Sequence, residues 1–235
     1  MKVFKYPNQE EWSRLCERPQ INKIDLKISV KSILNEVKNG GDSALINLAQ
    51  KFDKAELKSL KVTPLEIEQA INEVDQKLKD AIQLAKSNIE IFHNSQIEEV
   101  KVIETTRGVK CWRKGVAIEK VGLYIPGGTA PLFSTILMLG IPAKIAGSKE
   151  VILCTPPGKN GEINPAILYT ASLIGITSIF KVGGAQAISA MTYGTESIPQ
   201  VYKIFGPGNQ YVTKAKELVQ EEGVAIDMPA GPSEV

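Results

Sequence analysis

The chain has 235 residues, of which 43% are hydrophobic and 23% are charged, an ordinary composition for a folded globular protein. Its 28 basic and 26 acidic residues nearly balance, and Lys and Glu alternate along predicted helices without forming a basic stripe. Three scattered cysteines and a single histidine exclude the ligand spacings of a zinc finger. We therefore expect reduced thiols and no nucleic-acid partner.

Membrane and export segments are also not expected. The first residues lack the apolar stretch of a signal peptide. The longest apolar run, around residues 136–145, is interrupted by Gly140, Pro142 and Lys144, so it cannot span a bilayer. The sequence thus predicts a cytoplasmic protein without a membrane partner.

Residues 1–108 are predicted to form a helical N-terminal region and the start of a first α/β domain. Gly40-Gly41 predicts a helix stop between two apolar helix faces. Thr63-Pro64-Leu65-Glu66 has the pattern of a capping box with proline at the first helical position. A further helix through Leu78 and Phe92 ends beside His93, which we interpret as a packed or capping residue. The two apolar faces comprise Val30, Ile33, Leu34 and Val37, then Leu45, Leu48, Ala49 and Phe52.

Residues 109–235 are predicted to form a Rossmann-like nucleotide-binding domain that runs into a truncated return segment. Short β-branched runs end in glycine-rich turns and alternate with helical stretches, one of which begins at Asn164-Pro165. This alternation indicates an α/β fold, in which the helical region precedes a Rossmann-like open parallel sheet with helices on both faces. The predicted strands cover residues 121–125, 151–154, 178–182, 202–205 and 225–227.

All the glycine-rich turns follow strands, so they should gather at one edge of the sheet, where helix N-termini present free N–H groups to ligands. Five such turns in succession favour a binding edge over a purely structural one. The dinucleotide fingerprint is incomplete, because Gly206-Pro207-Gly208 is followed by Tyr211 where a third glycine is needed. The acidic residue that usually binds ribose about 20 residues further on is not obvious either.

Three polar side chains at this edge are candidate nucleotide ligands. Tyr124 could pack its ring on a base or ribose and donate its hydroxyl. Gln186 and Asn209 offer amides at predicted helix starts, where each could bind ribose or phosphate. The structural alternative is that both amides cap their own helices, and it is stronger for Asn209 than for Gln186.

No catalytic base is evident, because no histidine and no pair of carboxylates lies in a glycine-rich turn. Cys154 ends a predicted strand within an apolar run, which disfavours a nucleophilic role. The residues alone therefore indicate a nucleotide- or phosphate-binding α/β domain behind a helical region.

The turns also resemble histidinol dehydrogenase in sequence, order and spacing. The resemblance rests on the segments that begin at Val121 (Val-Gly-Leu-Tyr-Ile-Pro-Gly-Gly), Val182 (Val-Gly-Gly-Ala-Gln), Lys203 (Lys-Ile-Phe-Gly-Pro-Gly-Asn) and Ile226 (Ile-Asp-Met-Pro-Ala-Gly-Pro-Ser-Glu-Val). Lys51-Phe52-Asp53 and the stretch from Asn88 to His93 extend it into the helical region.

The resemblance implies a homodimeric, zinc-dependent enzyme that uses NAD to oxidise L-histidinol through the aldehyde to L-histidine. By matching motifs, it implies that Tyr124, Gln186 and Asn209 contact NAD and that Ser233 contacts histidinol. The catalytic Glu-His pair and the zinc ligands of the family come after the Pro-Ser-Glu-Val segment. We therefore expect no catalytic residue and no metal ligand in this chain, and no turnover by the chain alone.

Two other hypotheses remain open at this point. The chain could be a non-catalytic nucleotide-binding or oligomerisation module that retains the fold. It could also be a thiol enzyme of the aldehyde-dehydrogenase type, which would require a reactive Cys154.

Overall fold

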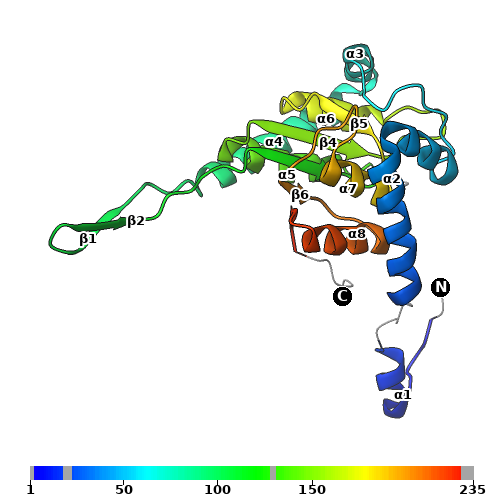
Figure 1. The fold of residues 1–235 in the computed structure, drawn as a ribbon, viewed down its shortest axis with the longest axis horizontal. Helices are drawn as coiled ribbons and strands as arrows, with labels where there is room; N and C mark the ends of the chain where they lie inside the picture. Colours follow the sequence, from blue (N-terminus) through cyan, green and yellow to red (C-terminus); the bar gives the residue numbers. More distant parts are fainter. Residues whose placement is uncertain (1–2, 18–22, 128–130, 229–235) are drawn as a thin grey trace.

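The computed structural model describes residues 3–17, 23–127 and 131–228, and it confirms the predicted α/β class (Figure 1). Helices dominate the first hundred residues, after which strands and helices alternate. The helices are α1 (Gln9–Leu15), α2 (Lys23–Phe52), α3 (Pro64–Glu73), α4 (Gln76–Asn94), α5 (Phe133–Ala146), α6 (Pro165–Leu173), α7 (Gly184–Tyr193) and α8 (Gln210–Glu221). The strands are β1 (Val102–Thr106), β2 (Val109–Trp112), β3 (Lys120–Tyr124), β4 (Glu150–Thr155), β5 (Ser178–Lys181), β6 (Lys203–Phe205) and β7 (Ala225–Ile226).

Five strands form one parallel sheet in the order β5-β4-β3-β6-β7. In its register, Val121 of β3 lies opposite Val151 of β4 on one side and Lys203 of β6 on the other. The chain starts in the middle of the sheet, builds outward to β5, and then returns to the other side of β3. This is the doubly wound order of nucleotide-binding sheets, with its reversal between β3 and β6.

Helices cover both faces of the sheet, as the sequence predicted. On one face α2, α7 and α8 pack together, and on the other α5 packs with α4 and α6, while α3 packs on α6. Successive strand residues point to opposite faces, so Tyr124 joins the first core while Leu123 and Ile125 join the second. The helical N-terminal region thus supplies part of both layers, and the domain boundary that we propose at residue 108 falls in the turn between β1 and β2.

Local capping chemistry starts the helices where the sequence predicted. The Glu66 backbone N–H donates to Thr63 Oγ1 at 3.2 Å, and the Thr63 N–H donates to a Glu66 carboxylate oxygen at 2.8 Å. Asn164 caps α6 by accepting from the Ala166 N–H at 2.9 Å. Both caps confirm predictions that depended only on residues three or fewer positions apart.

The predicted break at Gly40-Gly41 is confirmed as a kink inside α2. Gly41 has φ 52° and ψ −136°, a non-helical conformation that separates two helical segments across the kink. The second half of α2 starts with the Asp42 N–H donating to Glu196 at 2.8 Å, while the Asp42 carboxylate accepts from Thr195 Oγ1 at 2.6 Å. The loop after α7 therefore anchors the start of the second half of α2.

The antiparallel hairpin of β1 and β2 was not predicted. It projects away from the body in Figure 1, and every residue of both strands is exposed. A strand that buries neither face shows no alternation of apolar and polar residues, so the pattern that reveals other strands is missing here.

Candidate functional site

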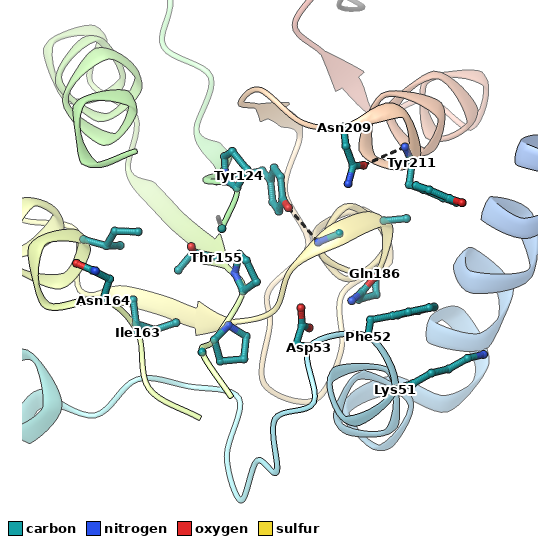
Figure 2. A pocket seen from close by; sticks show the side chains of 18 of the residues that line it. Lys51, Phe52, Asp53, Tyr124, Thr155, Ile163, Asn164, Gln186, Asn209 and Tyr211 are labelled. Carbon is teal, nitrogen blue, oxygen red and sulfur yellow. Dashed lines mark hydrogen bonds between the residues drawn. The ribbon is translucent and has the colours of Figure 1, made fainter. Parts of the chain in front are cut away.

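A cleft of about 1150 Å³ opens beyond the carboxyl ends of the parallel strands. The connection after β3 runs to the α5 face and the connection after β6 runs to the α8 face, which leaves a crevice where the sheet order reverses. The loops after β3 and β4, the first turns of α7 and α8, and one side of α2 line it (Figure 2). The predicted binding edge thus coincides with a real cavity.

Tyr124 lies at the end of β3 with its ring buried against the core. Its hydroxyl oxygen accepts a hydrogen bond from the Gly184 N–H at 3.0 Å, which ties β3 to the start of α7. Burial raises the pKa of Tyr124 to about 12, and the Asp53 charge contributes in the same direction. The group therefore stays a neutral hydroxyl, whose proton can be donated into the cleft.

Gln186 lies in the first turn of α7, only 3% exposed and lining the cleft. The N-cap of α7 is Gly183, and no side chain makes the capping hydrogen bond there. The alternative that Gln186 caps its own helix is therefore wrong, and its amide remains available to a ligand.

Asn209 does cap its own helix, as the structural alternative proposed. Its Oδ1 accepts from the backbone N–H groups of Tyr211 at 3.0 Å and Val212 at 3.1 Å. Capping uses only the amide oxygen, so the Nδ2 donors of Asn209, which lines the cleft, stay available (Figure 2). One side chain can thus start α8 and bind a ligand.

Packing accounts for two of the loop glycines. A Cβ added at Gly127 would lie 2.5 Å from Pro156, and one added at Gly183 would lie 2.4 Å from the same side chain. The loops after β3 and β5 therefore close around the loop after β4. These glycines shape the cleft wall, whatever binds there.

The Gly206 loop is held by a buried charged group of α8. Lys216 is 6% exposed and donates to the Gly206 carbonyl oxygen at 2.8 Å and to the Asp227 carboxylate. Asp227 in turn accepts from the Gly206 N–H at 2.8 Å. Together these contacts fix the turn that leads into Asn209.

Asp53 and Thr155 also line the cleft, although sequence reasoning did not select them as site residues. Asp53 was noticed only as part of the resemblance, and Thr155 only as part of a turn. Burial raises the pKa of Asp53 to about 6 from its usual 3.8. No local pattern could have selected Asp53, because it lies 71 positions before Tyr124 (124 minus 53).

The raised pKa of Asp53 predicts a pH-dependent stability difference. A raised pKa means that folding favours the protonated acid, so this stabilisation is present at low pH and is lost as pH rises through about 6. We expect Asp53→Asn to gain stability over the unchanged chain as pH rises from about 4.5 to about 7.5. The gain should be about 1 kcal/mol after allowing for the partial exposure of the carboxyl group.

Denaturant unfolding of both chains at the two pH values measures this difference. Among the described residues, the other charged side chains lining the cleft are Glu36, Lys51 and Glu162. They are the same in both chains, so their contributions to stability cancel in the comparison. A stability difference that is equal at both pH values would show that Asp53 is not destabilised by its surroundings.

The remaining predicted residues lie away from the cleft or outside the described part of the chain. Cys154 is fully buried in the core, where burial raises the pKa of its thiol well above its usual range, against the thiol-enzyme hypothesis. His93 lies in the last turn of α4, edge to face with the Phe92 ring and with Nδ1 2.7 Å from Gln96 Oε1. Ser233 lies outside the described residues.

Neither a metal-binding cluster nor a membrane helix is found in residues 3–17, 23–127 and 131–228. They contain no group of three or more His, Cys, Asp or Glu side chains placed to hold a metal ion. The zinc that the resemblance implies has no ligand set there, and we assign it no residue. In the same ranges, no helix has the length and apolar character needed to cross a membrane.

Comparison with known proteins, by family model, by sequence and by structure, leads to the same family. The family model for histidinol dehydrogenase matches residues 16–235. The histidinol dehydrogenases of Bacteroides fragilis and Campylobacter jejuni are 63% and 51% identical to this chain, covering all of it and 55% of each relative. A crystal structure of histidinol dehydrogenase from Elizabethkingia anophelis matches with a TM-score of 0.90 and 58% identity, over 97% of this chain and 52% of that one. The chain spans about half the length of the relatives it matches.

Proposed function

The chain belongs to the histidinol dehydrogenase family, and from this premise we propose that its α/β domain binds NAD in the cleft between β3 and β6. Three features support the proposal: the reversal of the sheet order at the cleft, its volume, and polar groups on three separate elements. Tyr124 from β3, Gln186 from α7 and Asn209 from α8 all line it. The observation that carries the proposal is the convergence of these three side chains at the order reversal.

Each residue has a distinct role in this proposal. The Tyr124 hydroxyl, already oriented by the Gly184 N–H, donates its proton to a ribose or amide oxygen of NAD. The Gln186 amide supplies a donor and an acceptor from a buried position. Asn209 Nδ2 donates while its oxygen holds the start of α8. Because helix capping and packing fix all three side chains, little conformational entropy is lost on binding.

For the longer proteins of the family, we propose the oxidation of L-histidinol to L-histidine in histidine biosynthesis, in a zinc-dependent homodimer located in the cytoplasm. The NAD bound in such an enzyme accepts the hydride that leaves the substrate carbon. The share of this chain would be to bind and orient NAD, and to contact the substrate through Ser233. The catalytic residues and zinc ligands would come from segments after Val235.

Calorimetric titration with NAD tests the nucleotide site. We expect the chain to bind NAD, and Tyr124→Phe and Gln186→Ala each to weaken binding by about threefold to tenfold, since each removes one hydrogen bond. Tyr202→Phe is a matched control, because Tyr202 is exposed and does not line the cleft. It should leave NAD affinity unchanged.

Absence of NAD binding by the unchanged chain would contradict the proposal and leave the non-catalytic structural module as the better hypothesis. Equal weakening by Tyr202→Phe and Tyr124→Phe would place the nucleotide outside this cleft. The activity proposed for the longer proteins is measured separately, as NADH formed on addition of L-histidinol.

A further inference from the structure

One lysine and one aspartate bind both backbone polar groups of Gly206. The Lys216 ammonium group donates to the Gly206 carbonyl oxygen at 2.8 Å, and the Gly206 N–H donates to Asp227 Oδ2 at 2.8 Å. The ammonium group also donates to Asp227 Oδ1, which closes a ring of three contacts. The Lys216–Asp227 pair thus joins the turn after β6, the helix α8 and the residue after β7.

The pair fixes a residue that lies directly against β3. Gly206 has φ 133°, and a Cβ built there would lie 2.0 Å from the Tyr124 carbonyl oxygen. Because glycine has no side chain, only its backbone groups and close packing can hold it in place. Asn209 starts α8 three positions later (209 minus 206). The pair therefore sets the position of Asn209 relative to Tyr124, two of the three candidate nucleotide ligands.

The same aspartate also fixes the end of β7. The Asp227 backbone N–H donates to the Ile204 carbonyl oxygen at 3.2 Å, which continues the pairing of β6 with β7 by one residue. In the sequence, Ser233 follows Asp227 by six positions (233 minus 227). Asp227 thus holds two segments together: the turn of the nucleotide cleft and the strand from which the chain continues to Ser233.

The chemistry of the pair favours a positioning role over a purely stabilising one. A buried ion pair contributes little more stability than apolar side chains of the same volume, because removing both charges from water offsets their attraction. It does impose direction, since an ammonium group only donates and a carboxylate only accepts. Neither residue lines the cleft, so the pair acts on a ligand through Gly206 and β7.

We propose that Lys216 and Asp227 are positioning residues for both binding segments of the site, the Gly206 turn with Asn209 and the segment that leads from β7 to Ser233. This inference rests on the proposed function, because it names the residues that place the NAD-binding and histidinol-binding segments relative to each other. Neither residue touches a ligand in this proposal.

Calorimetric titration of the protein that carries this chain, with NAD and separately with L-histidinol, tests the proposal. Lys216→Met removes the donor to Asp227 and to the Gly206 carbonyl oxygen. At a temperature where the variant is folded, the dissociation constant for NAD should rise by about tenfold and that for L-histidinol by about threefold. A residue that only stabilises the fold would leave both constants of the folded protein unchanged.

Lys181→Met is the matched control. Lys181 and Glu66 form an ion pair with side-chain exposures of 12% and 28%, against 8% and 29% for Lys216 and Asp227. This pair joins β5 to α3, and neither residue lines the cleft. Lys181→Met should therefore lower the free energy of unfolding to a similar extent and leave both dissociation constants unchanged.

Asp227→Asn provides a second test that holds even if Lys216→Met fails to fold. An asparagine amide oxygen can still accept from the Gly206 N–H, but the charge that pairs with Lys216 is lost. Both dissociation constants should rise by about threefold. Circular dichroism melting of each variant verifies that it folds.

The outcomes separate this inference from the proposed function. If the unchanged protein does not bind NAD, the proposed function itself fails. If it binds NAD and the folded Lys216 and Asp227 variants bind both ligands as tightly, the pair is only structural and the inference is overturned. Equal weakening by Lys181→Met has the same meaning. If NAD affinity alone falls, or the unchanged protein does not bind L-histidinol, the claim that one pair positions both segments is overturned.

Discussion

Replacing Gly206 with alanine is expected to lower the free energy of unfolding by roughly 3–5 kcal/mol. Gly206 has φ 133°, a conformation that side-chain-bearing residues rarely adopt. A Cβ built there would lie 2.0 Å from the carbonyl oxygen of Tyr124. That atom belongs to the backbone where β3 leaves the sheet, so it cannot move aside as a flexible side chain could. Denaturant unfolding of the two chains measures the loss.

Gly223→Ala is the matched control for this prediction. Gly223 also has a positive φ, 98°, but a Cβ there would meet nothing within 4 Å. It should cost only the conformational strain, about 1–2 kcal/mol. If both variants lose the same stability, contact with the Tyr124 backbone is not the reason for glycine at position 206.

Gly206→Ala should in addition weaken NAD binding, because the Gly206 turn leads into Asn209.

The second large effect concerns Lys216, whose ammonium group is buried between the Gly206 carbonyl and Asp227. Lys216→Met keeps most of the apolar stem but removes the donor to Asp227 Oδ1 and to the Gly206 carbonyl oxygen, which leaves the carboxylate with only the Gly206 N–H as a donor. We expect a loss of about 3 kcal/mol, in the lower part of the range for breaking a buried ion pair, because the Asp227 side chain is 29% exposed. Thermal and denaturant unfolding measure this loss.

Two controls sharpen the Lys216 prediction. Lys149→Met breaks an ion pair with Glu119 on the surface, where both side chains are well exposed, and it should have little effect on stability. The double variant Lys216→Met/Asp227→Asn should be more stable than Lys216→Met alone, because no unpaired buried charge remains. A Lys216→Met protein as stable as Lys149→Met would mean that the pair does not hold the Gly206 turn.

Much of the fold could be predicted from the sequence, because the determining interactions are local. The caps at Thr63 and Asn164 join residues two or three positions apart. The alternation of strands and glycine-rich turns implies parallel crossovers, and such crossovers place all the turns at one edge. Tyr124, Gln186 and Asn209 were selected as site residues for this reason, and the structure brings them to one cleft.

The sequence left open how each of these side chains would be used. Asn209 Oδ1 is committed to capping α8, whereas Gln186 makes no cap. Both residues follow glycine-rich turns, so local sequence could not distinguish them. The difference arises from the N-cap position, which Gly183 occupies in α7 and Asn209 itself occupies in α8. The β1–β2 hairpin escaped prediction because no core imposes a pattern on it.

By itself, then, the sequence determined the α/β class, the sheet edge at which the glycine-rich turns gather, and the family, since each depends on patterns or motifs that span a few residues. Only the tertiary structure decided which distant groups complete the cleft. Asp53 reaches it because α2 packs on α7 and ends at the sheet edge, and Lys216 holds Gly206 because α8 packs against α7 and β7. Contacts between residues far apart in the chain depend on how whole elements pack, and no short pattern encodes that packing.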